Sequence, residues 1–309
     1  MQKTAFIFPG QGSQSIGMGK DFYDNSSVAR EMIQNASDAA GIDFGSLLFE
    51  ENDKLEQTEY TQPAILLVSA IAHRLFEDAQ NVRPQFALGH SLGEFSALVS
   101  VSALDYIDGV KLVHQRGKLM KEACEGKDAG MMALIGLDDA TVEKITAEAR
   151  EAGKEVWAAN YNSNGQIVAA GKKADLAAME SVFKEAGAKR ALLLNMSVAS
   201  HCPLLQSAVA PLKESLEAAL KEEFIAPVVS NVTAEKYSTK EEAIVLLPEQ
   251  LVKPVLYKQS IEKFDDEIDL FIEFGGNVLK GLNRRSTKKP TLSVTDMASL
   301  EAAFEALAK

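Results

Sequence analysis

Short apolar runs alternate with longer segments whose apolar residues recur every three or four positions. The apolar runs at residues 4–8 and 84–88 are bounded by proline or glycine, which is typical of buried strands. The acidic stretch that ends at Glu59 has no clear period and is predicted to be irregular. Strands that alternate with helices indicate a parallel sheet covered on both faces. Helices are predicted over residues 28–40, 62–79, 92–104 and 106–125.

The order of the elements changes near Gly126. Two strands are predicted on either side of Asn162-Ser163-Asn164-Gly165, a sequence typical of a hairpin turn. Strand, helix, two strands, helix and strand is the split βαβ pattern of ferredoxin-like domains, which can bury a core of their own. The strands are expected at residues 131–137, 156–161, 166–170 and 190–196, and the helices at 139–152 and 173–186.

After Val198 the chain returns to long helices and short strands, predicted at residues 203–223, 228–231, 242–250, 270–274 and 278–286. We therefore expect an α/β protein with two domains. Residues 1–126 and 198–309 would form a large domain with a parallel-sheet core similar to that of the α/β-hydrolases. Residues 127–197 would form a small ferredoxin-like domain inserted into it.

Composition places the chain among ordinary globular proteins. Of its 309 residues, 46% are hydrophobic and 25% are charged, so a full core is available. The two cysteines, Cys124 and Cys202, exclude a disulfide framework and favour the reducing cytoplasm. The N-terminus lacks the pattern of a signal peptide, and no apolar stretch approaches the ~20 residues of a membrane span. We expect a cytoplasmic protein that does not bind membranes.

The formal net charge of −12 argues against a nucleic-acid-binding surface. Basic residues nevertheless gather in two places. Residues 280–290 contain five lysines and arginines and no acid, and Lys189 and Arg190 form a smaller cluster. An acidic partner would have to dock on such a local cluster, although a solvated surface is the usual explanation for a run of this kind.

The most informative motif is Gly89-His90-Ser91-Leu92-Gly93, a G-x-S-x-G between a predicted strand and a predicted helix. This is the context of a nucleophile elbow, where the serine occupies a tight strand-to-helix turn and glycines give the neighbouring backbone room. The helix directs its free N–H groups toward the serine, where an oxyanion would form. The motif predicts a nucleophilic Ser91. An ordinary glycine-rich turn is the alternative.

A serine hydroxyl is a weak nucleophile until a base removes its proton. The chain has four histidines. His73 and His114 lie in predicted helices, and His90 is poorly placed to reach the hydroxyl of its own neighbour. His201 lies in a loop where the small domain rejoins the large one, and such loops often border a cleft. By elimination we predict that His201 is the base.

The group that orients this histidine is less evident. A hydrolase of the α/β type has an aspartate or glutamate between the serine and the histidine, and its histidine lies near the C-terminus. Here about a hundred residues follow His201, and no single acid stands out. A backbone carbonyl or a side-chain amide could orient the ring instead and would fix its tautomer without adding a full charge.

Five motifs follow one another along the chain: Phe8-Pro9-Gly10-Gln11-Gly12-Ser13-Gln14, Gly89-His90-Ser91-Leu92-Gly93-Glu94, Gln115-Arg116-Gly117, Asn160-Tyr161-Asn162-Ser163 and Ser200-His201. Together they closely resemble the malonyl-CoA:acyl carrier protein transacylases of type II fatty acid synthesis. The resemblance extends from Phe8 to about Leu282, and it agrees with the two predicted domains.

The resemblance implies a ping-pong acyl transfer. Ser91 would accept the malonyl group from malonyl-CoA and pass it to the phosphopantetheine thiol of acyl carrier protein, with His201 as the base. The backbone N–H groups of Gln11 and Leu92 would form the oxyanion hole, since the glycines beside Gln11 let the backbone approach a ligand closely.

Arg116 would pair with the malonyl carboxylate through two N–H groups, a geometry that lysine does not offer. An acetyl group would leave the guanidinium buried and unpaired. Gln250 would orient the histidine through a carbonyl, which agrees with the missing acid. The chain departs from the family at Lys253, where asparagine is common, at Tyr257, where tryptophan is common, and in a shortened turn at Gly275-Gly276.

The carrier protein of this pathway is small and acidic, so the resemblance gives the basic clusters a role. Lys189, Arg190, Arg284 and Arg285 are the candidate docking residues. No metal ion and no redox cofactor is expected, because no ligand spacing suggests one.

Two other functions remain open at this stage. A serine esterase or thioesterase would share Ser91 and His201 but hand the acyl group to water. An enzyme for neutral acyl chains would have no use for Arg116, which favours the transferase. A catalytically silent scaffold that docks an acidic carrier protein would need neither Ser91 nor His201.

Overall fold

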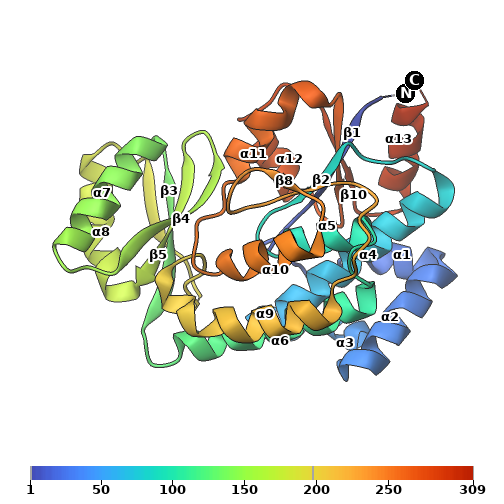
Figure 1. Ribbon diagram of the computed structural model, residues 1–309, viewed down its shortest axis with the longest axis horizontal. Helices are drawn as coiled ribbons and strands as arrows, with labels where there is room; N and C mark the ends of the chain where they lie inside the picture. Colours follow the sequence, from blue (N-terminus) through green and yellow to red (C-terminus); the bar gives the residue numbers. More distant parts are fainter. Residues whose placement is uncertain (1, 197, 309) are drawn as a thin grey trace.

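The computed structural model describes residues 2–196 and 198–308, so the predicted domain limits at residues 1, 197 and 309 lie outside the described residues. Its strands form two sheets (Figure 1). The larger sheet has the order β10-β9-β1-β2-β7-β8. Neighbouring strands in this sheet run parallel, except that β8 pairs antiparallel with β7 at one edge. The strands are β1 (Thr4–Phe8), β2 (Phe86–Gly89), β7 (Val228–Val229), β8 (Lys236–Tyr237), β9 (Leu270–Phe274) and β10 (Thr291–Val294).

Both faces of the larger sheet are covered, because alternate side chains of β1 enter different cores. Phe6 and Phe8 belong to the main core with the long helix α4, whereas Ala5 and Ile7 pack in a second core that includes Tyr257 of α11. The helices of this part are α1 (Lys20–Asn25), α2 (Ser27–Ala40), α3 (Phe44–Phe49), α4 (Thr58–Ala79), α5 (Gly93–Ser100), α6 (Tyr106–Cys124), α9 (Gln206–Ala219), α10 (Lys240–Glu249), α11 (Tyr257–Phe264), α12 (Val278–Asn283) and α13 (Met297–Leu307).

The smaller sheet is antiparallel and has the order β4-β5-β3-β6. Met132 and Leu134 of its central strand pack with Phe183 in a separate core beneath two helices. In Figure 1 this unit lies to one side of the larger sheet, with α7 and α8 on its outer face. Its elements are β3 (Ala129–Ile135), α7 (Asp139–Glu151), β4 (Val156–Ser163), β5 (Gln166–Lys172), α8 (Lys173–Glu185) and β6 (Arg190–Leu193).

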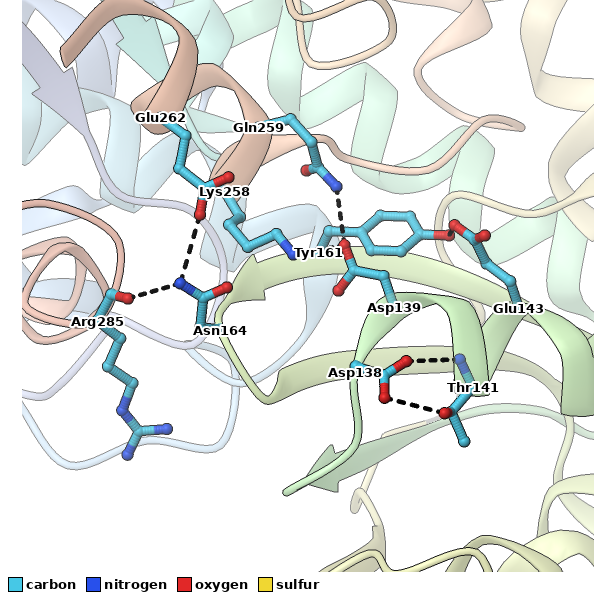
Figure 2. A network of polar contacts seen from close by, with 10 residues as sticks. All are labelled: Asp138, Asp139, Thr141, Glu143, Tyr161, Asn164, Lys258, Gln259, Glu262 and Arg285. Atoms are coloured by element: carbon cyan, nitrogen blue, oxygen red, sulfur yellow. Dashed lines mark hydrogen bonds and ion pairs between the residues drawn. The ribbon is translucent and has the colours of Figure 1, made fainter. Parts of the chain in front are cut away.

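Backbone and side-chain contacts join the smaller sheet to the rest of the chain. Val255 extends the edge of β4, because its carbonyl accepts from the Tyr161 N–H at 2.9 Å and its own N–H donates to the Ala159 carbonyl at 2.8 Å. Figure 2 shows the polar contacts beside this bridge. Lys258 at the start of α11 forms an ion pair with Asp139 at the start of α7. These contacts hold the smaller sheet against the rest of the chain.

The predicted elements are largely present, with shifted ends. Asn162 and Ser163 lie in β4, so the hairpin turn is reduced to Asn164-Gly165. The helix predicted over residues 92–104 ends at Ser100, because Ser102 adopts a left-handed conformation that closes a helix C-terminus. The helix predicted over residues 203–223 is a short 3₁₀ turn, Pro203–Leu205, followed by α9.

The expectation of an irregular segment up to Glu59 was wrong, since it contains α3 and the start of α4. Asp43 and Ser46 explain part of this: the Asp43 side chain accepts from the Ser46 N–H and caps α3. The helices α1, α11 and α13 and the strands β8 and β10 were also not predicted. No helix among residues 2–196 and 198–308 is long and apolar enough to cross a bilayer.

The close contact between the elbow and β1 predicts that a side chain at Gly93 destabilises the fold. A Cβ added to Gly93 would lie 2.0 Å from the Phe8 carbonyl oxygen, whereas one added to the exposed Gly281 of α12 would meet no heavy atom within 4 Å. Gly93→Ala should therefore lower the free energy of unfolding by about 1–3 kcal/mol. Gly281→Ala should leave it unchanged or raise it by up to about 1 kcal/mol. Urea unfolding measures both, and equal stabilities would contradict the argument.

Candidate active site

Ser91 occupies the turn between β2 and α5 with φ of 52°, a left-handed conformation that is strained for serine. Packing enforces the turn. A Cβ on Gly89 would fall within 1.7 Å of the Gly93 backbone, so the chain can double back only with glycine there. The His90 N–H also donates to the Phe8 carbonyl at 3.0 Å, which fastens the turn to β1. The strain is local to the residue that the sequence predicts as the nucleophile.

His201 lies within reach of this serine. Its Nε2 is 2.8 Å from the Ser91 Oγ, and its Nδ1 is 2.6 Å from the Gln250 backbone carbonyl. A carbonyl oxygen can only accept, so Nδ1 carries the proton and Nε2 is left to accept from the serine hydroxyl. The pair predicted from sequence is therefore brought together, and the neighbour of the histidine is a carbonyl and not an acid.

The surroundings keep His201 neutral. Its side chain is 2% exposed. Burial, followed by the charge of Arg116, lowers the pKa of His201 to about 3, while the hydrogen bond to Gln250 acts in the opposite direction. A neutral imidazole is the form that can accept the serine proton.

Arg116 lies beside the same serine. It projects from α6, is 1% exposed, and its Nη2 is 3.3 Å from the Ser91 Oγ. The guanidinium also donates to the Gln62 side chain at 2.7 Å and to the Gln250 Oε1 at 2.9 Å. Its Nε–H has no acceptor among the described residues. A buried cation with an unmet donor next to a nucleophile suits a ligand with an anionic oxygen.

The charge of Arg116 persists at neutral pH. Burial lowers the pKa of Arg116 to about 10, and the nearby carboxylate of Glu94 raises it. The guanidinium also lies over the ring of Phe95, 5.2 Å from its centroid, which gives it a second favourable contact.

Gln11 and Leu92 line the same cavity as Ser91. Neither of their backbone N–H groups donates to an acceptor among the residues that the structure describes. The loop of Gln11 passes close to the elbow, since a Cβ on Gly10 would lie 2.3 Å from the His90 carbonyl oxygen. These two N–H groups are thus available to a ligand, as the predicted oxyanion hole requires.

The cavity has a volume of about 310 Å³ and lies between the two sheets. The elbow, His201 and Arg116 line it from one side of the chain's fold, the smaller sheet contributes Asn160 and Val168, and Leu194 follows the last strand of that sheet. Part of its lining is therefore apolar and part is polar, which suits a small polar acyl group carried on a longer chain.

Sequence reasoning missed a set of buried polar residues behind the site. Asn231 follows β7, and its Oδ1 accepts from the Ser91 N–H at 2.7 Å while its Nδ2 donates to the Gly89 carbonyl at 2.6 Å. Glu94 accepts from the Asn231 N–H and from the Gln250 Nε2. Asn231 gave no signal in the sequence, because only the pairing of β7 with β2 brings it to the elbow.

The other histidines have different surroundings. His90 lies 2.7 Å from the Asn162 Oδ1, through its Nε2, and does not contact the serine hydroxyl. His114 contacts the Glu59 carbonyl, and His73 packs edge-on against Phe6. Within the described parts of the chain, no cluster of three His, Cys, Asp or Glu side chains could hold a metal ion.

The four predicted docking residues are all exposed. Lys189 and Arg190 lie at the start of β6, and Arg284 and Arg285 follow α12. In the described ranges, none of the four forms an ion pair with an acid. In Figure 2 the Arg285 carbonyl accepts from Asn164 of the hairpin turn, and the Arg285 guanidinium points away from the network.

Comparisons with known proteins agree with this geometry. The model of a family described as the acyl transferase domain matches residues 5–285. The chain is 38% identical to the malonyl CoA-acyl carrier protein transacylase of Bacillus subtilis (strain 168), over 99% of this chain and 98% of the relative. Its structure is similar to that of the malonyl-CoA:acyl carrier protein transacylase from Helicobacter pylori, with a TM-score of 0.97 and 47% identity over 100% of this chain and 99% of that chain.

A second similar structure is a malonyl-transacylase solved in complex with its type II PKS acyl-carrier protein. The TM-score is 0.94 and the identity 36%, over 98% of this chain and 99% of that chain. The likeness therefore spans both sheets and the cavity between them.

The low pKa of His201 predicts how the rate of Ser91 acylation depends on pH. Because the ring stays neutral well below its ordinary pKa, the rate at which Ser91 is acylated should not fall between about pH 7.5 and pH 5.5. Single-turnover measurements at each pH test this. Enzyme returned from the lowest pH to the highest must regain its rate, which excludes unfolding. A one-proton decline centred near 6.5 would show that the base has an ordinary pKa.

Proposed function

Because the chain belongs to the acyl transferase family, with malonyl CoA-acyl carrier protein transacylases as relatives along its whole length, we propose that it transfers the malonyl group of malonyl-CoA to acyl carrier protein. The observation that carries this proposal is the buried guanidinium of Arg116, 3.3 Å from the Ser91 Oγ and with an unmet Nε–H. The acyl acceptor is the phosphopantetheine thiol of the carrier protein.

The first half-reaction forms an ester on the enzyme. The Ser91 Oγ attacks the thioester carbonyl while the His201 Nε2 takes the hydroxyl proton. The N–H groups of Gln11 and Leu92 stabilise the oxyanion of the tetrahedral intermediate. The C–S bond then breaks, and the proton on Nε2 passes to the leaving CoA sulfur. Malonyl-serine and free CoA result.

The second half-reaction runs the same steps with a different thiol. The His201 Nε2 accepts the proton of the phosphopantetheine thiol, and the sulfur attacks the ester carbonyl. Collapse of the intermediate breaks the bond to the Ser91 Oγ, which recovers its proton from Nε2. The Gln250 carbonyl keeps the imidazole oriented through both halves.

Selectivity for malonyl follows from Arg116. The malonyl carboxylate gains a charge-assisted pair with a guanidinium that is already desolvated. An acetyl group leaves the cation unpaired, and loss of one partner of a buried charge pair costs roughly 2–5 kcal/mol in comparable truncations. The same argument disfavours an esterase or thioesterase for neutral acyl chains.

The arrangement of the sheets supports a two-domain description. We propose that residues 127–197 form a ferredoxin-like domain inserted into an α/β-hydrolase-like domain of residues 1–126 and 198–309. The order β3-α7-β4-β5-α8-β6 and the antiparallel sheet fit the small domain, and an elbow after a parallel strand fits the large one. Both cysteines are buried free thiols, which supports our proposal of a cytoplasmic enzyme.

We propose Lys189, Arg190, Arg284 and Arg285 as the docking residues for the acidic carrier protein. Exposed basic residues that form no ion pair among the described residues can pair with a partner without breaking an existing ion pair. The Asn164 contact with the Arg285 carbonyl, 2.9 Å long, holds the second cluster against the small domain.

The proposed reaction is tested by mass spectrometry of the intact enzyme. Malonyl-CoA should leave a malonyl adduct on Ser91 that disappears when holo-acyl carrier protein is added. Ser91→Ala should form no adduct. In Arg116→Ala, the preference for malonyl-CoA over acetyl-CoA as acyl donor should fall roughly 30-fold or more. Equal labelling of the wild type by the two donors would contradict the role of Arg116.

Docking is tested by reversing charge. The double variant Arg284→Glu, Arg285→Glu should raise the KM for holo-acyl carrier protein roughly five- to tenfold at low salt and leave the KM for malonyl-CoA unchanged. Arg83→Glu is a suitable control, because Arg83 is exposed and precedes β2 at the opposite end of the strand from Ser91. A similar effect in the control would contradict a local docking surface.

A further inference from the structure

Glu94 is a buried acid that the mechanism above does not use. Its side chain is 1% exposed, and it forms no direct ion pair with any described residue. The Oε2 accepts from the Asn231 N–H at 3.0 Å and from the Gln250 Nε2 at 2.7 Å, and the Oε1 accepts from the Tyr237 hydroxyl at 3.0 Å.

One amide separates this acid from the cation of the site. The Gln250 Oε1 accepts from the Arg116 Nη2 at 2.9 Å, and the Gln250 Nε2 donates to the Glu94 Oε2. The amide dipole is thus aligned between a guanidinium and a carboxylate. In the free enzyme, Glu94 is the acid whose charge acts on Arg116.

Malonyl binding upsets this balance. The proposed function brings a second carboxylate to Arg116, so two buried anions would share one buried cation. An unbalanced charge in a desolvated site is costly, and a titratable group there changes its protonation state instead. We propose that Glu94 takes up one proton from solvent when the malonyl carboxylate pairs with Arg116, so that the site holds one cation and one anion both before and after binding.

The structure provides a place for this proton. Asn231 and Gln250 only donate to Glu94, but the Tyr237 hydroxyl can also accept. The new Oε1–H would donate to the Tyr237 Oη, whose own hydrogen turns away. Burial and the charge of Glu94 raise the pKa of Tyr237, so its hydroxyl stays neutral and can make this exchange.

Electrostatics around Glu94 favour the uptake. Burial raises the pKa of Glu94 to about 7, against the lowering effects of three hydrogen bonds and of Arg116. A malonyl carboxylate on Arg116 would raise it further, because it repels a second negative charge. The histidines nearby stay neutral, since burial lowers the pKa of both His201 and His90. The acid Glu242 on α10 acts on Tyr237.

The sign of the linkage fixes the pH range of the test. Glu94 is protonated with and without ligand well below its free-enzyme pKa, so no uptake occurs near pH 5.5. Uptake is largest between the pKa of the free enzyme and that of the complex, near pH 8. In that range the KM for malonyl-CoA rises with pH, with a limiting slope of about tenfold per pH unit.

Glu94→Gln is the decisive variant. Its amide can keep all three hydrogen bonds, with the oxygen toward Asn231 and Gln250 and the nitrogen toward Tyr237, and it mimics the protonated acid. The KM for malonyl-CoA of this variant should be independent of pH between about 6.5 and 8.5. Glu273→Gln is the control, because Glu273 is also buried with a raised pKa but lies against the start of α12. In this control, the KM for malonyl-CoA should rise with pH as steeply as in the wild type.

Calorimetry measures the proton directly. Ser91→Ala is titrated with malonyl-CoA and with acetyl-CoA near pH 8, in two buffers of different ionisation enthalpy. Binding of malonyl-CoA should be accompanied by the uptake of as much as one proton more than binding of acetyl-CoA. This difference should vanish near pH 5.5, and it should vanish near pH 8 in the double variant Ser91→Ala, Glu94→Gln. A structural role of Glu94 would instead lower kcat at every pH without changing the slope of KM.

This inference rests on the proposed function, but the two can fail separately. If wild-type enzyme forms no malonyl adduct on Ser91, the proposed function is wrong. If the adduct forms and the extra proton is absent, or persists in the Glu94→Gln background, the role of Glu94 is refuted while the reaction stands.

Discussion

The hydrogen bonds of Gln250 hold the site together. Its backbone carbonyl accepts from the His201 Nδ1, its side-chain oxygen accepts from Arg116, and its side-chain nitrogen donates to Glu94. One fully buried residue at the end of α10 thereby fixes the proposed base, the proposed carboxylate-binding cation and a buried acid in one frame. The backbone contacts His201, whereas the side chain contacts Arg116. Since a substitution removes the side chain and keeps the carbonyl, it would disturb Arg116 more directly than His201.

A neutral acceptor behind the histidine suits a substrate that carries its own charge. An aspartate in the place of the Gln250 carbonyl would add an anion beside Arg116 and would compete with malonate for it. A carbonyl still fixes the tautomer of His201, because it can only accept. The cost is a weaker pull on the imidazolium that forms during the reaction. In the proposed mechanism, the N–H groups of Gln11 and Leu92 would then supply most of the electrostatic stabilisation of the tetrahedral intermediate.

The sequence could predict local features better than long-range pairings. The elbow, the parallel strand β1 and the hairpin of β4 and β5 follow from glycines and apolar periods close together in the chain. Asn231 was missed because it reaches the elbow across more than a hundred residues, through the pairing of β7 with β2. The helix α3 was missed for a local reason, since it has only six residues and depends on a cap at Asp43. The carbonyl that orients His201 was predicted through the family resemblance, since any residue has a carbonyl.

The bridge between Val255 and β4 also bears on solubility. A sheet edge with unpaired backbone groups can template the addition of a strand from another molecule, and proteins protect such edges with covering segments or charged side chains. Val255 covers the β4 edge. The opposite edge, β6, is shielded instead by Arg190 at its start, while Leu192 on the same strand is 60% exposed. Charged side chains on an edge strand disfavour such pairing, so replacing Lys189 and Arg190 with apolar residues would leave an exposed edge that favours aggregation.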